Sequence, residues 1–93
     1  MLPSKEIVNQ PSATIIDVRS PMEFESSHVN GAINIPLEYV STSVEQFKNF
    51  SKPVILYCRS GNRSGLALHI LKASGVTEAY NGGGLDDMQN LLN

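Results

Sequence analysis

The segment that decides the fold reads VILYCRSGNRSG over residues 54–65. Four apolar residues, Val54–Tyr57, lead directly into Cys58, the single cysteine of the chain, and small or basic residues follow it. This order predicts a buried strand, a tight loop and then a helix over Ser64–Ser74. Loop amides and a helix N-terminus both present positive charge. We therefore expect them to converge near the sulfur and to favour its ionised, reactive form.

Composition excludes several classes of function. The chain has 93 residues, 41% of them apolar, and a net charge of -2, which indicates one globular domain. With no long basic run, nucleic acid is not an expected partner. One cysteine can form neither an internal disulfide nor a CxxC pair, so we expect no metal and no cofactor.

The expected location and assembly follow from missing signals. No apolar stretch reaches the ~18–20 residues of a membrane helix, and the first residues lack the order of a signal peptide. We therefore expect no membrane association and a cytoplasmic protein, or a periplasmic one if the chain is a processed form. We expect a monomer, because no coiled-coil pattern or unused apolar stripe is visible.

Strands and helices alternate along the chain. The apolar or β-branched runs predict strands at Thr14–Val18, Ala32–Ile35, Val54–Tyr57 and Thr77–Tyr80. Capping residues and helical spacing predict helices at Ser4–Gln10, Ser20–Ser26, Ser43–Phe50, Ser64–Ser74 and Leu85–Leu92. The run Asn81–Gly84 is expected to be a flexible turn.

This alternation predicts an α/β fold with a largely parallel sheet and helices on both faces. Ligands bind beyond the carboxyl ends of the strands in such folds. Cys58 stands at the end of one predicted strand, and Asp17 and Arg19 stand at the end of another. We expect these polar groups to meet at the same edge of the sheet.

Three motifs together resemble the single-domain rhodaneses, and the resemblance covers almost the whole chain. They are IDVR with the later EF and HVNGAINIP (within 16–36), YCRSGNRS (57–64) and the glycine run (82–84). In size the chain is similar to small bacterial stand-alone rhodaneses, including the phage-shock type. The resemblance implies a three-layer fold over residues 1–93, with about five short strands. The chain departs from the family pattern at Ser27 and Asn30, where Gly and Pro are usual, and lacks the tryptophan that often follows the glycine turn.

The resemblance implies a thiosulfate sulfurtransferase. Cys58 would attack thiosulfate, carry the sulfur as a persulfide and pass it to cyanide or a thiol. An alternative is a persulfide carrier that takes its sulfur from another donor or relays it to a protein partner.

The loop residues are the expected substrate-binding group. They are Arg59, Ser60, Gly61, Asn62, Arg63 and Ser64. Their amides can stabilise the thiolate, and an arginine can bind a dianion with two hydrogen bonds. Whether Arg59 or Arg63 does so stays open, because either can instead fix the loop through an internal ion pair.

Five residues receive structural interpretations. Gly61 is expected to need a positive φ. Asp17 and Arg19 are expected to support the site as an ion-pair or hydrogen-bond network, with Glu23 as a further candidate member. His28 falls in a structural turn of the family, and the chemistry needs no general base once the thiol is ionised.

Two rival functions fit the sequence less well. One is a phosphatase or an arsenate reductase with a similar loop. Tyrosine and dual-specificity phosphatases need an arginine six positions after the cysteine, but Ser64 stands there and Arg63 comes one position early. The shorter loop suits a sulfur atom better than a phosphate. Regulatory rhodanese-like domains generally lack the cysteine, which this chain keeps.

Overall fold

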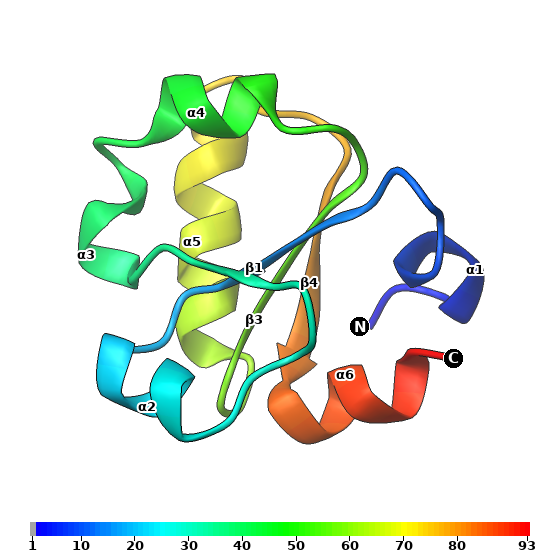
Figure 1. The fold of residues 1–93 in the computed structure, drawn as a ribbon. Helices are drawn as coiled ribbons and strands as arrows, with labels where there is room; N and C mark the ends of the chain where they lie inside the picture. The colour runs from blue at the N-terminus through cyan, green and yellow to red at the C-terminus, as the bar shows by residue number, and fades with distance from the viewer. Residues whose placement is uncertain (1) are drawn as a thin grey trace.

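Four parallel strands form the centre of the protein (Figure 1), whose computed structural model describes residues 2–93. They lie in the order β2-β1-β3-β4 and comprise β1 (Thr14–Asp17), β2 (Ile33–Asn34), β3 (Val54–Cys58) and β4 (Ala79–Gly84). The predicted parallel α/β fold is confirmed. The expected number of about five strands is wrong, because helices and turns occupy the remaining described segments.

Six helices lie before, between and after the strands in residues 2–93. They are α1 (Lys5–Val8), α2 (Pro21–Ser26), α3 (Leu37–Val40), α4 (Val44–Asn49), α5 (Asn62–Ala73) and α6 (Leu85–Leu91). The start of α2 has the capping box that its sequence predicts: the Ser20 hydroxyl and the Glu23 carboxylate each accept a backbone N–H. The short α3 was not predicted, because Pro36 was expected only to end the preceding strand and a single turn is too short to show helical spacing. No helix in this part of the chain is long and apolar enough to cross a membrane.

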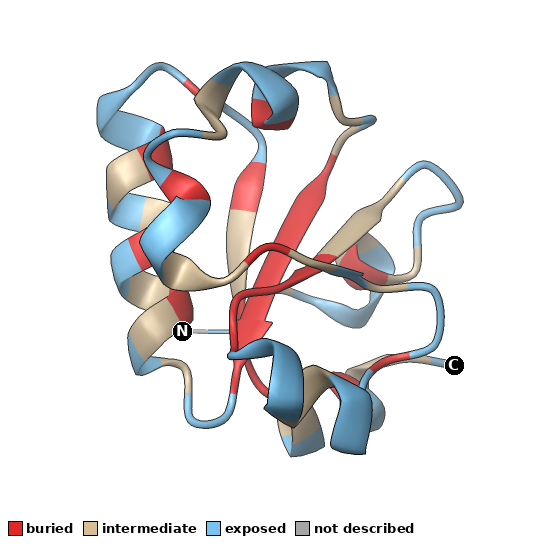
Figure 2. Cartoon of the chain, turned by 60° about the vertical axis from the view of Figure 1, so that its left-hand side comes forward, coloured by how far each residue is buried: buried red, intermediate tan, exposed pale blue. Residues whose placement is uncertain are grey.

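The sheet is covered on both faces, so the protein has three layers. On one face, Leu56 and Cys58 of β3 pack with buried residues of α3, α4 and α5. On the other, Ile55 and Tyr57 pack with residues of α1 and α6. All of β3 is therefore buried (Figure 2), as expected for a strand in the middle of a parallel sheet.

The glycine run is a strand and not the flexible turn that its composition predicts. Gly82, Gly83 and Gly84 are buried in β4, where the pairing with β3 contains a register shift. Gly83 has a φ of +83°, and a Cβ on Gly84 would overlap the carbonyl oxygen of Arg59. Glycine is needed here because the backbone of the Cys58 loop packs directly on β4.

Candidate active site

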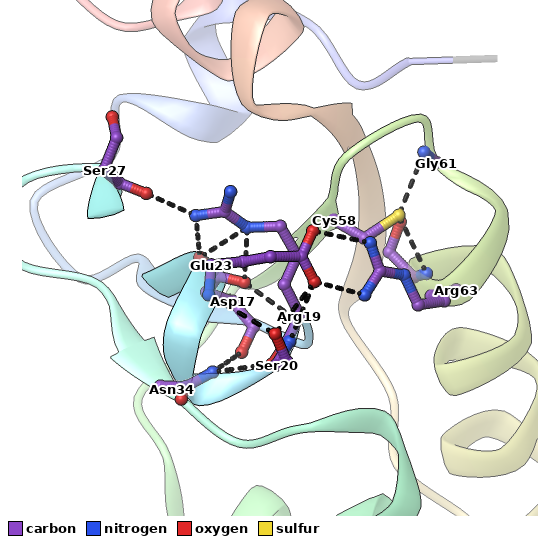
Figure 3. Close-up of polar contacts among 10 residues, drawn as sticks. Asp17, Arg19, Ser20, Glu23, Ser27, Asn34, Cys58, Gly61 and Arg63 are labelled. Carbon is purple, nitrogen blue, oxygen red and sulfur yellow. Dashed lines mark hydrogen bonds and ion pairs between the residues drawn. The ribbon is translucent and has the colours of Figure 1, made fainter. Parts of the chain in front are cut away.

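Cys58 is the last residue of β3, a central strand between β1 and β4. It is 1% exposed, and its side chain belongs to the core on the α5 side of the sheet. Figure 3 shows its sulfur at the start of α5, near the polar residues that follow β1. The two strand ends thus lie at one edge of the sheet, since Asp17 is in register with Tyr57.

The loop after Cys58 is shorter than the sequence suggests. Only three residues, Arg59–Gly61, separate β3 from α5, which begins two residues before the predicted Ser64. Gly61 makes this possible because its φ of +98° lies in the left-handed region. Its N–H donates to the Cys58 sulfur over 3.0 Å.

Ser64 supplies two more donors to the same sulfur. Its backbone N–H lies 3.5 Å from Cys58 Sγ and its hydroxyl oxygen 3.4 Å from it. Burial raises the pKa of Cys58, but the Ser64 hydroxyl and amide and the Ser60 and Gly61 amides outweigh burial and lower that pKa overall. The positive end of the α5 dipole acts in the same direction. This arrangement favours the thiolate, the form that reacts.

Arg63 is held by Glu23 of α2. Its Nη1 and Nη2 donate to Glu23 Oε1 and Oε2 over 2.7 and 3.0 Å, and both side chains are about a third exposed. The bond from Arg63 lowers the pKa of Glu23 to about 2, and the same bond raises the pKa of Arg63. The sequence left open whether Arg63 binds a substrate anion or forms an internal ion pair. In the structure it forms the ion pair, which joins α5 to α2.

Arg59 has different surroundings from Arg63. It is exposed, and within residues 2–93 no carboxylate lies at ion-pair distance from it. It borders an open cavity of about 350 Å³ lined by Arg19, Glu23, Ser26, Ser27, Arg59, Leu85 and Asp86. The guanidinium of Arg59 is therefore free to meet an anion that enters beside the loop. Asn62 is also exposed, at the first position of α5.

Asp17 and Arg19 form a buried ion pair beside the loop. Arg19 donates to both carboxylate oxygens of Asp17, with Nη2 to Oδ2 at 2.7 Å, and also to the carbonyl of Ser27. Asn34 of β2 donates to the carbonyls of both residues over 3.0 Å. Glu23 does not join this pair, because it binds Arg63 instead. The Asp17–Arg19 pair fixes the chain after β1 and one wall of the cavity.

His28 makes contacts within its own segment. Its Nδ1 lies 2.7 Å from the carbonyl oxygen of Phe24, and the two rings stack with centroids 3.7 Å apart. These contacts match the structural turn assigned to His28.

Asn81 is a residue near the sulfur that sequence reasoning missed. Its Nδ2 donates to the Gly61 carbonyl over 3.0 Å, and its Oδ1 accepts from the Ser64 hydroxyl over 2.7 Å. It was hidden in a glycine-rich segment that reads as a turn. The predicted strand before it, Thr77–Tyr80, would have pointed to Asn81 had it been extended by one residue.

A model of the rhodanese-like domain matches residues 4–90. The chain belongs to the rhodanese family. A 69-residue stretch, 74% of this rhodanese, is 46% identical to the uncharacterized protein YqhL of Bacillus subtilis (strain 168), but spans only 54% of that protein. Thiosulfate sulfurtransferase PspE of Escherichia coli (strain K12) is 43% identical over 77 residues, covering 78% of this chain and 71% of PspE.

A solved rhodanese from E. coli has the same fold. Its structure, described as containing anions, superposes with a TM-score of 0.73 at 42% identity, covering 81% of this chain and 89% of that one. Family membership and these relatives support sulfur transfer as the general chemistry of this rhodanese.

Proposed function

We propose that this rhodanese is a sulfurtransferase that carries sulfane sulfur as a persulfide on Cys58. One observation supports the proposal above others: three donors from Gly61 and Ser64 surround a buried sulfur. Such a set of neutral donors stabilises a sulfur anion without a general base. Preorganised donors of this type contribute most where charge develops, because they need no reorganisation during the reaction.

The first step loads the enzyme. The Cys58 thiolate attacks the outer sulfur of thiosulfate, and a bond forms between the two sulfurs. The sulfur–sulfur bond of thiosulfate breaks, and sulfite leaves with the electron pair. The product is a Cys58 persulfide anion, which the loop donors can stabilise in place of the thiolate.

The second step unloads it. A nucleophilic acceptor, cyanide or a thiol, attacks the terminal sulfur of the persulfide, and Cys58 leaves as the thiolate. The same chemistry serves a carrier or relay function, in which another persulfide is the donor or a protein thiol is the acceptor. The open cavity that Arg59 borders gives a small donor a place beside the loop.

Arg59 is the proposed binding residue for the sulfonate end of the donor. A guanidinium suits an anion with several oxygens, and in the described part of the chain no carboxylate lies at ion-pair distance from Arg59. We assign the substrate-binding loop around the sulfur to Ser60, Gly61, Asn62 and Ser64. In the proposed enzyme Arg63, Asp17 and Arg19 support this loop and do not bind the donor.

A phosphatase function is disfavoured by the same arginine. Hydrolysis of a phosphate ester at a cysteine loop needs a guanidinium over the sulfur, and the Arg63 guanidinium is instead paired with Glu23. The proposed assignment therefore keeps the preference for sulfur that the loop spacing predicts.

A turnover assay tests the proposal. Wild type, supplied with thiosulfate and cyanide, should produce thiocyanate, and Cys58→Ser should produce none. The same preparations should leave an aryl phosphate unhydrolysed. Thiocyanate formation that survives in Cys58→Ser, or phosphatase activity comparable to sulfur transfer, would reject the assignment.

A further inference from the structure

We propose that Asn81 is a positioning residue that holds the Gly61 backbone and the Ser64 hydroxyl against the Cys58 sulfur. It is half-buried on β4 and reaches across to the start of α5. The inference rests on the proposed function, since it assigns to Asn81 the support of the donors that the sulfur anion requires.

The amide of Asn81 fixes Gly61 at its carbonyl end. Two donors meet the Gly61 oxygen: Asn81 Nδ2 at 3.0 Å and the Gly65 N–H of α5 at 2.9 Å. The other end of the same residue presents its N–H to the sulfur. Glycine has wide conformational freedom, so the bond from Asn81 adds a second restraint on the Gly61 carbonyl to the one that the Gly65 N–H provides.

The side-chain oxygen of Asn81 accepts a hydrogen bond from the Ser64 hydroxyl. A serine hydroxyl has one hydrogen to donate, and the Ser64 oxygen lies 2.7 Å from Asn81 Oδ1 but 3.4 Å from the sulfur. When Cys58 is a thiol, the hydroxyl donates to Asn81. When Cys58 is ionised, the hydroxyl can turn its hydrogen to the sulfur, where a charge-assisted bond is stronger.

Asn81 tolerates this exchange because its oxygen has a second partner. The Gly83 N–H donates to Asn81 Oδ1 over 2.9 Å, so the oxygen is not left without a donor when Ser64 turns away. Asn81 thus stays in place while the Ser64 hydrogen moves between its oxygen and the sulfur.

The test measures the pKa of Cys58 directly, from the pH dependence of its alkylation by iodoacetamide. Asn81→Ala should raise that pKa by about one unit, because the lost restraint on Gly61 and Ser64 weakens their bonds to the sulfur by about the value of one hydrogen bond to a charged group. This loss is expected to outweigh the opposite effect of freeing the Ser64 hydrogen from Asn81 Oδ1. Below both pKa values the alkylation rate should then fall about tenfold. Asn81→Ser, which removes the amide but keeps a polar side chain, should shift the pKa in the same direction if the alanine variant does not fold.

Asn9 provides a matched control. Its amide also donates to a distant carbonyl, that of Leu91 at 2.8 Å, and its oxygen accepts the Asn93 N–H, but these bonds join α1 to the C-terminal residues. Asn9→Ala should lose comparable hydrogen bonds and leave the pKa of Cys58 unchanged. None of these variants changes a charged residue at this edge of the sheet, where the charged residues are Asp17, Arg19, Glu23, Arg59, Arg63 and Asp86.

Either of two results overturns the inference. One is a folded Asn81 variant whose Cys58 titrates at or below the wild-type pKa. The other is an equal shift in Asn9→Ala, which would mean that the pKa follows general loss of stability. Alkylation reads the thiol whether or not thiosulfate is the donor, so failure of the sulfurtransferase proposal would be seen separately.

Discussion

Arg59 and Arg63 carry the same charge in the same loop, but the structure gives them different surroundings. Glu23 accepts hydrogen bonds from both Nη atoms of Arg63, whereas Arg59 borders the open cavity. An arginine that is already paired must break that pair to bind a substrate anion. We therefore propose that the free arginine binds the donor, since this costs less, and that the paired one holds the loop.

Replacing each arginine by alanine should separate these two roles. Arg59→Ala should raise the KM for thiosulfate about tenfold, because a hydrogen bond from a charged group contributes about 1.5 kcal/mol at the lower end of its range. The alkylation rate of Cys58 should stay close to wild type. Arg63→Ala should instead slow alkylation at neutral pH, since it removes a positive charge and leaves the Glu23 carboxylate unpaired near the sulfur.

Steady-state kinetics and iodoacetamide alkylation of the same preparations give both readouts. Arg59→Lys is the control for Arg59, because it keeps the charge but loses the two-pronged donor. If Arg63→Ala raised the KM while Arg59→Ala did not, the roles given to the two arginines would be reversed.

Residue-scale inference from the sequence reached Cys58, the loop residues that donate to its sulfur and the Asp17–Arg19 network, but not the contacts that hold the loop. Cys58 and the short loop follow from adjacent residues, whose spacing is visible in the chain. The Arg63–Glu23 pair and the contacts of Asn81 join residues far apart in the sequence, so only the folded sheet brings them together.

At the scale of elements, β4 and the Cys58 loop form one packed unit. The absence of a side chain on Gly84 lets the Arg59 carbonyl lie against the strand. Composition alone suggests a turn, since glycine most often provides flexibility. Here the glycines allow close approach of two backbones, which local sequence cannot distinguish from a turn.

Gly84→Ala should therefore displace the loop. The added Cβ would overlap backbone, which cannot move aside as a side chain does, so we expect a loss of about 1–3 kcal/mol in the free energy of unfolding. Alkylation of Cys58 should also slow, because the Gly61 and Ser64 donors move with the loop. Urea unfolding and iodoacetamide kinetics provide the two measurements.

Gly75→Ala is the control for a general loss of stability. Gly75 has a φ of +92° after α5, with open space where a Cβ would stand. Its substitution should cost about 1–2 kcal/mol through backbone strain and leave alkylation unchanged. A Gly84→Ala protein with wild-type stability and reactivity would contradict the packed unit.

At the scale of the whole molecule, the layers were predictable and some boundaries were not. Apolar runs such as Val54–Tyr57 identify buried strands because no polar residue interrupts them. The short α3 has too few residues to show a helical period, and the length of β4 depends on its partner strand. Long-range pairing, which the sequence does not display, decides the end of β4, whereas the apolar runs alone indicate the four strands that form.

The ion pair between α2 and α5 makes stability depend on pH. Because the pKa of Glu23 is lowered from 4.5 to about 2, the folded protein binds this proton less readily than the unfolded chain. The stabilisation is therefore complete above pH 4.5 and is lost as the pH falls toward 2. For a pair this exposed, we expect about 1 kcal/mol at neutral pH.

Unfolding of wild type and Glu23→Gln by urea at several pH values measures this contribution. The difference in free energy of unfolding between them should shrink as the pH falls from 4.5 to 2. Glu25→Gln, on the same helix, is the control for loss of one negative charge and should retain the wild-type decline. A constant difference between wild type and Glu23→Gln would exclude the pair as a source of acid sensitivity.

The central claim is that Cys58 carries sulfur as a persulfide, and the mass of the intact protein tests it most directly. After incubation with thiosulfate and removal of excess donor, wild type should gain the mass of one sulfur atom and lose it when cyanide is added. Cys58→Ser should show no gain. Wild type that remains unmodified by both thiosulfate and a small-molecule persulfide donor would contradict the account.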